Sequence, residues 1–195
     1  MSHQGSGLVQ PSVVQLPADH GLYQSRRLVA FFRSRFSDKI WMAVSETDGQ
    51  SWTREEQTSL PQNNKAIQAI RLQSGNIALV LNNNGGSPAA RNVMQPLSIA
   101  LSEDGGVTWP FLRDLEPYYR KDMDYTYPSI VQTDDGAIHI CHTWSRRRRR
   151  ETIRYMQISE AWIRGRYPWG TTRGVLQPGS QTFLKHASSF QHQGQ

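Results

Sequence analysis

Short runs of alternating or uniformly apolar residues, separated by turn-forming residues, recur along most of this chain. Two of these runs, residues 40–44 and 96–101, each lead into an octapeptide and then into another extended segment. Alternation with a period of two is typical of β-strands, and a short turn between two extended segments is typical of a hairpin. The pattern therefore predicts an all-β chain in which both octapeptides are hairpin turns.

The two octapeptides are similar to each other: SETDGQSW runs from Ser45 to Trp52, and SEDGGVTW runs from Ser102 to Trp109. Their chemistry suits a turn, because Ser and Asp side chains accept hydrogen bonds from nearby backbone N–H groups and Gly supplies a positive φ. The two Trp residues are 57 positions apart (109 − 52). A period of this size is typical of propellers with about four strands per unit.

Other segments recur in register with the octapeptides. Residues 10–16 (QPSVVQL) and 127–133 (YPSIVQT) are near copies, with residues 67–72 as a third version between them. Each copy precedes a turn and a second predicted strand, at residues 27–32, 76–81 and 137–143. We therefore predict three repeated units of antiparallel strands.

The predicted units cover residues 8–60, 61–117 and 118–163. The first two are expected to have four strands each, whereas the third is expected to stop after a strand at 152–159, with no octapeptide and no fourth strand. Residues 1–7 and the Gly-rich segment 164–195 show no sustained period. We predict a disordered N-terminus and a loosely ordered tail for these two segments.

The second octapeptide matches every fixed position of S-x-D-x-G-x-T-W, and in this the chain resembles the Asp-box of sialidases and related BNR-repeat proteins. The first octapeptide is looser, because Asp48 comes one place late and Ser51 replaces Thr. The resemblance covers about residues 8–163 and is also carried by residues 30–35, 101–106 and 125–129. It implies an all-β fold: a partial β-propeller with about three four-stranded blades, the C-terminal half of a six-bladed sialidase-like propeller.

In the sialidase-like family the Asp-box is a structural hairpin away from the active site. The resemblance therefore assigns a structural role to the box residues Ser45, Asp48, Gly49, Trp52, Ser102, Asp104, Gly106, Thr108 and Trp109. Three blades leave a ring open. Either the N-terminal half lies on a lost piece of the gene, or two chains pair to close the ring, in which case self-association would cover the open blade edges.

Composition adds limits to this picture. Among the 195 residues, 37% are hydrophobic and there are six Trp, seven Tyr and six Phe, which suits β-rich packing. No apolar stretch approaches the roughly 18 residues of a membrane span, and the N-terminus shows no secretory signal. The localisation therefore stays open. A single Cys141 excludes an internal disulfide framework.

The charge pattern points to an anionic ligand. The formal net charge is +6, and residues 146–150 are an unbroken run of five Arg. Nucleic-acid binding is disfavoured, because no helix-turn-helix, zinc spacing or aromatic platform accompanies the run. A solvated loop is the ordinary interpretation, but guanidinium groups also match carboxylates bidentately. We expect Arg147 to face a site and its neighbours to face solvent.

Side chains at matched ends of the second strands in successive units are expected to converge on one opening. The candidate substrate-binding residues are Arg33, Arg35, Asn83, Arg91, Trp144 and Arg147. The resemblance implies an anionic sugar as the partner of this opening. It also implies a tyrosine nucleophile, an exception among glycosidases, because a neutral phenol activated by an acid is not repelled by the carboxylate of the substrate. Tyr125 or Tyr127 with Asp124 are the catalytic candidates.

Two departures from the family pattern limit the expectation of catalysis. The arginine motif of sialidases, Phe or Tyr followed by Arg-Ile-Pro, is absent, since Phe32-Arg33 continues as Ser34-Arg35. The acid/base aspartate of that family belongs to N-terminal blades. We therefore expect a sialidase-like glycoside hydrolase domain whose isolated fragment is inactive. Non-catalytic carbohydrate binding, or a relative that acts on uronates as a lyase or glycosidase, are the alternatives.

No cofactor and no metal are expected. His139 and His142 are three residues apart on a predicted strand, so their side chains point to opposite faces. The chain also lacks GxGxxG, P-loop and Gly-x-Ser-x-Gly motifs.

Overall fold

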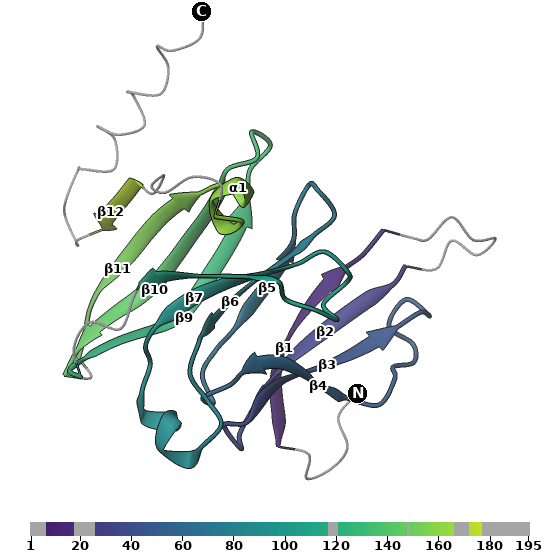
Figure 1. The fold of residues 1–195 in the computed structure, drawn as a ribbon, viewed down its shortest axis with the longest axis horizontal. Helices are drawn as coiled ribbons and strands as arrows, with labels where there is room; N and C mark the ends of the chain where they lie inside the picture. The colour runs from purple at the N-terminus through teal and green to yellow at the C-terminus, as the bar shows by residue number, and fades with distance from the viewer. Residues whose placement is uncertain (1–6, 18–25, 117–120, 148, 166–171, 177–195) are drawn as a thin grey trace, which may run out of the picture.

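A computed structural model describes residues 7–17, 26–116, 121–147, 149–165 and the backbone of 172–176. The described chain forms three separate four-stranded antiparallel sheets, which stand side by side in chain order (Figure 1). The first strands of neighbouring sheets contact each other, as expected for sheets that radiate from a common centre. The predicted all-β partial propeller is confirmed.

In each sheet, strands that are consecutive in the chain are neighbours. In the third sheet a short helix lies between the last two strands. The first sheet contains β1 (Leu8–Gln15), β2 (Leu28–Ser34), β3 (Lys39–Ser45) and β4 (Glu56–Pro61). The second contains β5 (Gln68–Arg71), β6 (Ile77–Asn82), β7 (Leu97–Ser102) and β8 (Phe111–Glu116), with the 3₁₀ helix η1 (Pro88–Asn92) between β6 and β7. The third contains β9 (Met123–Gln132), β10 (Ile138–Arg146), β11 (Arg149–Ile158) and β12 (Thr172–Leu176), with α1 (Glu160–Ile163) before β12.

The third sheet differs from the expected three-stranded one. β12 pairs antiparallel with β11 over residues 172–176, inside the segment that the sequence predicts to be a loosely ordered tail. This segment has only five residues with Gly174 at its centre, so its sequence pattern does not predict a strand. Pairing with β11 satisfies backbone groups that would otherwise form an open edge. This pairing forms the strand even though the residues themselves have a low strand propensity.

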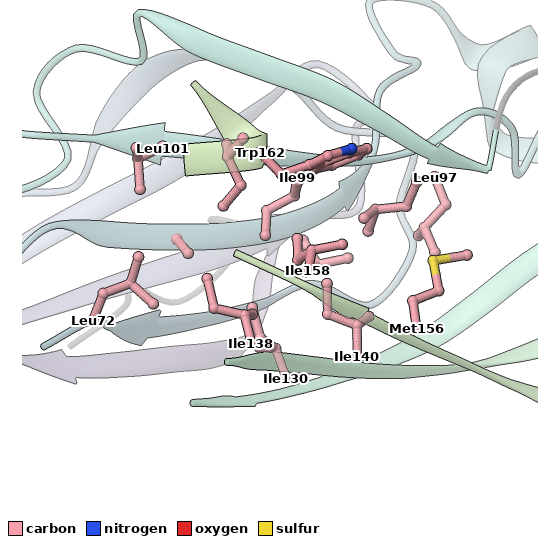
Figure 2. Close-up of a cluster of buried hydrophobic side chains, with 14 of the residues drawn as sticks. Leu72, Leu97, Ile99, Leu101, Ile130, Ile138, Ile140, Met156, Ile158 and Trp162 are labelled. Atoms are coloured by element: carbon pink, nitrogen blue, oxygen red, sulfur yellow. The ribbon is translucent and has the colours of Figure 1, made fainter. Parts of the chain in front are cut away.

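The two central strands of the middle sheet, β6 and β7, are buried on both faces, which explains why their residues are mostly apolar. All six residues of β6 are buried. Ile77, Leu79 and Leu81 pack toward the first sheet, while Ala78 and Val80 pack toward the third. Figure 2 shows the latter cluster, in which side chains of β7, β10 and β11 meet around Ile99, Ile138 and Ile158.

The second Asp-box closes the hairpin between β7 and β8 with a compact set of hydrogen bonds. Ser102 Oγ accepts from the N–H of Gly106 and donates to Asp104 Oδ1, each at 2.8 Å. Asp104 also accepts from the N–H of Thr108 at 2.8 Å and from its hydroxyl at 2.5 Å. Burial raises the pKa of Asp104, but the bonds donated by Thr108 and Ser102 outweigh it, so this pKa lies below its ordinary value.

The first box, between β3 and β4, uses Thr47 where the second uses Asp104. Ser45 Oγ accepts from the N–H of Gly49 at 2.9 Å, and Thr47 Oγ1 accepts from the N–H of Ser51 at 2.8 Å. Trp52 Nε1 donates to the carbonyl of Gly49 at 3.0 Å. Asp48, which we predicted as the acid of this box, is instead an exposed turn residue with φ 55°. The loose match therefore reflects a hydroxyl in place of a carboxylate, two residues after the serine.

Both boxes lie at the same end of the sheets. Ser45 and Ser102, which begin the boxes, pair with Leu28 and Ile77, the first residues of the second strands. In the third sheet, α1 occupies the corresponding connection. Its Trp162 is 6% exposed and packs into the cluster between the second and third sheets.

Trp109 of the second box packs across the boundary between the first two sheets. Its ring meets that of the fully buried Phe31 edge to face, with centroids 5.6 Å apart. The indole is half-buried, and its Nε1 has no hydrogen-bond partner among the described residues. The box therefore joins two sheets in addition to closing its own hairpin.

We expect Trp109→Ala to lower the free energy of unfolding by about 2 kcal/mol, less than the full cost of truncating a buried Trp because the indole is half-buried. Denaturant titration measures this change. Trp109→Phe keeps the ring against Phe31 and removes the unpaired N–H, so it should cost less than about 1 kcal/mol. Equal losses for the two variants would contradict the contact with Phe31.

Among the described residues, no helix is long and apolar enough to cross a membrane.

Candidate functional site

A cavity of about 310 Å³ opens at the end of the sheets opposite the two boxes. Residues of the first and third sheets, and of the connections before and within the second sheet, line it, namely Arg33, Lys65, Ala66, Asn92, Met94, Asp124, Thr126, Tyr127, Ser145 and Arg150. A second hollow of about 250 Å³ adjoins it. The two hollows share Asn92, Met94 and Asp124, and the second adds Val93, Gln95, Lys121 and Met123.

Two matching β-bulges shape the rim of the cavity. Gln10 in β1 and Tyr127 in β9 have φ of 50° and 52°, and each precedes a proline. The pairing register shifts by one residue at both places. A bulge leaves one residue unpaired and turns the strand. The near copies that mark the repeat in the sequence therefore begin at a shared backbone feature.

The bulge in β9 separates the two candidate tyrosines. Tyr125 lies before the bulge and is 2% exposed, with its ring edge-on to His142 at 5.6 Å between centroids. Tyr127 lies in the bulge, is 55% exposed and lines the cavity. Two residues that would share a face of a regular strand thus face the core and the cavity respectively. Of the two phenols, Tyr127 is the one that a ligand in the cavity can reach, together with Asp124.

Arg33, at the end of β2, is oriented by two amide side chains. Its Nε donates to Asn64 Oδ1 at 2.8 Å, and its Nη1 donates to Gln10 Oε1. Burial lowers the pKa of Arg33, the Tyr127 phenol opposes this shift and Arg35 adds to it. No carboxylate is among the groups that shift the pKa of Arg33.

The arginine run contributes Arg150 to the cavity. Residues 146 and 149 pair across the β10–β11 hairpin, as do residues 145 and 150. This register brings Arg150 back from the tip, with its Cζ 5.0 Å from the centre of the Tyr127 ring, a cation–π arrangement. Arg147, which we predicted to face the site, sits at the tip with φ 48°. Its side chain is 78% exposed, 3.9 Å from Asp122 Oδ2.

Four other predicted binding residues are not part of the cavity lining, namely Arg35, Asn83, Arg91 and Trp144. Arg91 Nε donates to Ser37 Oγ at 3.1 Å, and its Nη2 donates to the carbonyl of Arg35. These two hydrogen bonds connect η1 to the turn that follows β2 of the first sheet. Trp144 packs on the core beneath Arg154, whose Cζ is 4.9 Å from the ring. Asn83 joins the second sheet through its N–H, which donates to the Pro96 carbonyl at 3.0 Å.

The connections between strands bring four residues to the cavity that the sequence pattern did not predict. Lys65 and Ala66 precede β5, whereas Asn92 ends η1 and Met94 follows it. These segments have no strand periodicity, so pattern alone does not mark them. One signal was available, because Ala66 stands immediately before the third repeat copy (67–72), at the position that Gln10 and Tyr127 have in the other two copies. Across the described residues, no cluster of His, Cys, Asp and Glu could hold a metal ion.

Three neighbouring four-stranded sheets, Asp-box turns at one end and a polar cavity at the other define a sialidase-like partial β-propeller. A family model described as a BNR repeat-like domain matches residues 1–140. The chain therefore belongs to the BNR repeat-like domain family, and the resemblance noted in the sequence is confirmed. A comparison with curated proteins found no match.

Solved structures show the same fold at low sequence identity. A leech intramolecular trans-sialidase aligns with a TM-score of 0.63 and 13% identity, over 80% of this chain and 24% of its own. A NanB sialidase variant from Streptococcus pneumoniae aligns with a TM-score of 0.53 and 14% identity, over 70% and 20%. An α-L-arabinanase from Penicillium chrysogenum aligns with a TM-score of 0.51 and 14% identity, over 88% and 51%. The chain thus spans 24% and 20% of the two sialidases and 51% of the arabinanase.

Proposed function

We propose that the cavity binds an anionic sugar, such as a sialic or uronic acid, within a glycoside hydrolase-like carbohydrate-binding fold. The supporting observation is Arg33, a half-buried guanidinium that lines the cavity with no carboxylate partner among the described residues. A desolvated charge without a counter-ion is costly. An acidic ligand would supply that counter-ion with bidentate geometry.

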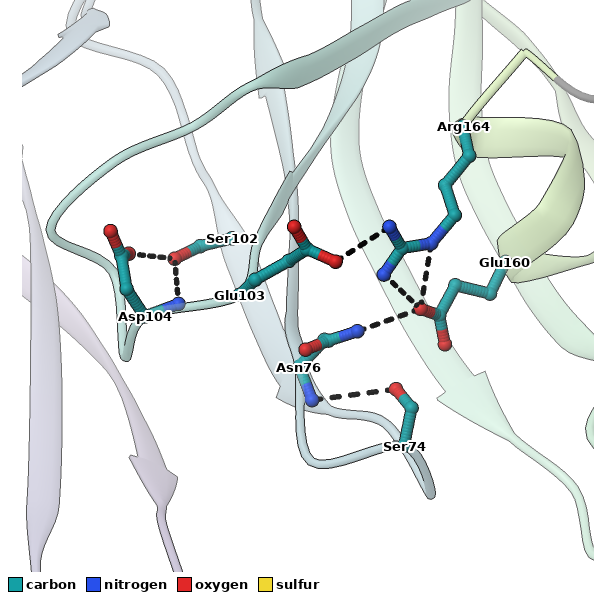
Figure 3. A network of polar contacts seen from close by, with 7 residues as sticks. All are labelled: Ser74, Asn76, Ser102, Glu103, Asp104, Glu160 and Arg164. Carbon is teal, nitrogen blue, oxygen red and sulfur yellow. Dashed lines mark hydrogen bonds and ion pairs between the residues drawn. The ribbon is translucent and has the colours of Figure 1, made fainter.

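Two other partly buried arginines, Arg154 and Arg164, are paired with acids. Arg164 lies 2.6 Å from Glu103 and 2.8 Å from Glu160 (Figure 3). Arg154 lies 2.8 Å from Glu116. These pairs tie elements of the second and third sheets together, which is an ordinary structural role. Arg33 lacks this kind of partner among the described residues, which supports a ligand-binding role for it.

The charges around the cavity agree with this proposal. Its lining carries three cationic residues, Arg33, Lys65 and Arg150, and one acidic residue, Asp124. A mouth of net positive charge attracts anions and loses part of that attraction as salt screens it. Tyr127 presents both a face for a sugar ring and a hydroxyl. In an assembly that also supplies a general acid, Tyr127 would serve as nucleophile and Asp124 as the base that activates it.

We expect Arg33→Ala to weaken the binding of N-acetylneuraminic or glucuronic acid by about tenfold or more, the usual worth of a charge-assisted hydrogen bond. Calorimetric titration at low and at moderate salt measures the change, and the affinity of the parent should fall as salt rises. Arg147→Ala is the matched control, since it removes the same charge from the hairpin tip outside the cavity.

Two results would contradict the proposal: equal affinity of Arg33→Ala and the parent, or equal affinity of the parent for an acidic sugar and its neutral counterpart. Binding without turnover of a sialoside or a uronoside would assign the chain to non-catalytic carbohydrate binding, which is the alternative from the sequence.

A further inference from the structure

The acceptors that hold Arg33 come from two sheets. Gln10 is on β1 of the first sheet, whereas Asn64 lies on the connection between β4 and β5 that leads into the second sheet. The guanidinium offers five N–H donors in a planar fork. The bonds to Asn64 and Gln10 use Nε and Nη1, and two anchor points on a rigid plane fix its orientation. Nη2 has no partner among the described residues, so it stays available to a ligand.

Both anchoring residues adopt a backbone conformation that is uncommon for residues other than glycine. Gln10 has φ of 50° and Asn64 has φ of 61°. The left-handed region costs non-glycine residues about 1–2 kcal/mol, although Asn tolerates it better than most residues. Such strain persists only where the surroundings enforce it, and it is concentrated at functional sites. Here it brings two amide oxygens onto one guanidinium.

The chemistry of the two anchors matters as much as their position. A carboxylate at either place would orient Arg33 equally well, as Glu160 orients Arg164 through Nε and Nη2. It would also neutralise the guanidinium, and an acidic ligand would then have to compete with an internal counter-ion. An amide oxygen accepts the same hydrogen bond and leaves the positive charge uncompensated.

We propose that Asn64 and Gln10 are positioning residues for Arg33, and that their neutrality makes the cavity selective for anionic sugars. This inference rests on the proposed function and names what controls its charge selectivity.

The decisive variant is Asn64→Asp, which keeps the size of the side chain and the acceptor for Arg33 Nε. We expect its affinity for glucuronic or N-acetylneuraminic acid to fall about tenfold or more, because Asp competes with the ligand for the guanidinium. Its thermal stability should stay unchanged or rise, because a paired charge replaces an unpaired one. A merely structural Asn64 would show the opposite pattern, with lost stability and little change in affinity at temperatures where the protein is folded.

Asn83→Asp is the matched control, since it makes the same change of charge outside the cavity. It should leave the affinity within about twofold of the parent. Gln10→Glu tests the second anchor in the same way, and it keeps the test decisive if Asn64→Asp does not fold. Parent-like affinity for acidic sugars in both anchor variants would overturn the inference.

A measurement without ligand separates this inference from the proposed function. The Arg33 Nε–H should give a resolved, slowly exchanging ¹H–¹⁵N signal in the parent, and Asn64→Ala should abolish or broaden it while the core amide signals persist. An unchanged signal would show that Asn64 does not position Arg33. If the signal is lost as expected but the parent binds no acidic sugar, the proposed function fails while the positioning of Arg33 stands.

Discussion

Replacing Gly106 by alanine is expected to lower the free energy of unfolding by about 3–4 kcal/mol. Gly106 lies in the second Asp-box with φ of 97°, where an L-residue is strained by about 1–2 kcal/mol. A Cβ there would come within 2.6 Å of Cζ of Phe31. Phe31 is fully buried and belongs to the first sheet, so it has little room to move, and overpacking adds about 1–3 kcal/mol.

Gly75→Ala supplies the control for this prediction. Gly75 has φ of 90°, but an added Cβ would meet nothing within 4 Å. Its loss should therefore reflect backbone strain alone, at about 1–2 kcal/mol. The excess for Gly106→Ala in denaturant titration measures how tightly the box packs against the neighbouring sheet. Equal losses for the two variants would contradict this packing.

Glu116→Gln is expected to cost about 2–3 kcal/mol at neutral pH, because the carboxylate joins two sheets at a buried position. Glu116 ends β8, and its side chain is 3% exposed. Its Oε1 lies 2.8 Å from Arg154 Nη1 and 3.6 Å from His142 Nε2, both on the third sheet. Removing one partner of a buried pair leaves the other charge without compensation. The variant Glu56→Gln, which changes an exposed residue of β4, should cost little.

The same residue predicts how stability depends on pH. Burial raises the pKa of Glu116, but the contacts with His142 and Arg154 outweigh burial and hold this pKa below its ordinary value. A group with a depressed folded pKa stabilises the protein above its unfolded pKa, and that contribution is lost as pH falls through the folded value. The difference in unfolding free energy between parent and Glu116→Gln should therefore shrink as pH falls below about 4.5. A difference that stays constant across this range would contradict the role of the carboxylate.

The sequence predicted the parts of the fold that repeat. The two boxes and the near copies that begin at Gln10 and Tyr127 predicted antiparallel sheets in series, because turn chemistry and alternation are local properties of the chain. The fourth strand of the third sheet was not predictable in this way. Pairing with the free edge of β11, rather than its own residues, determines β12.

The candidate site was predictable only in part, for a related reason. The sequence itself determined that arginines, tyrosines and acids gather near the ends of the second strands, and it marked Arg33, Asp124 and Tyr127. It could not say which member of a run of five arginines faces the cavity, since the register of the β10–β11 hairpin selects Arg150 and sends Arg147 to the tip. Nor could it distinguish Tyr125 from Tyr127, because one extra residue in a bulge reverses which side chains face the core. Local patterns encode strands and turns, whereas register, bulges and contacts between sheets depend on segments far apart in the chain, and only the tertiary structure decided these.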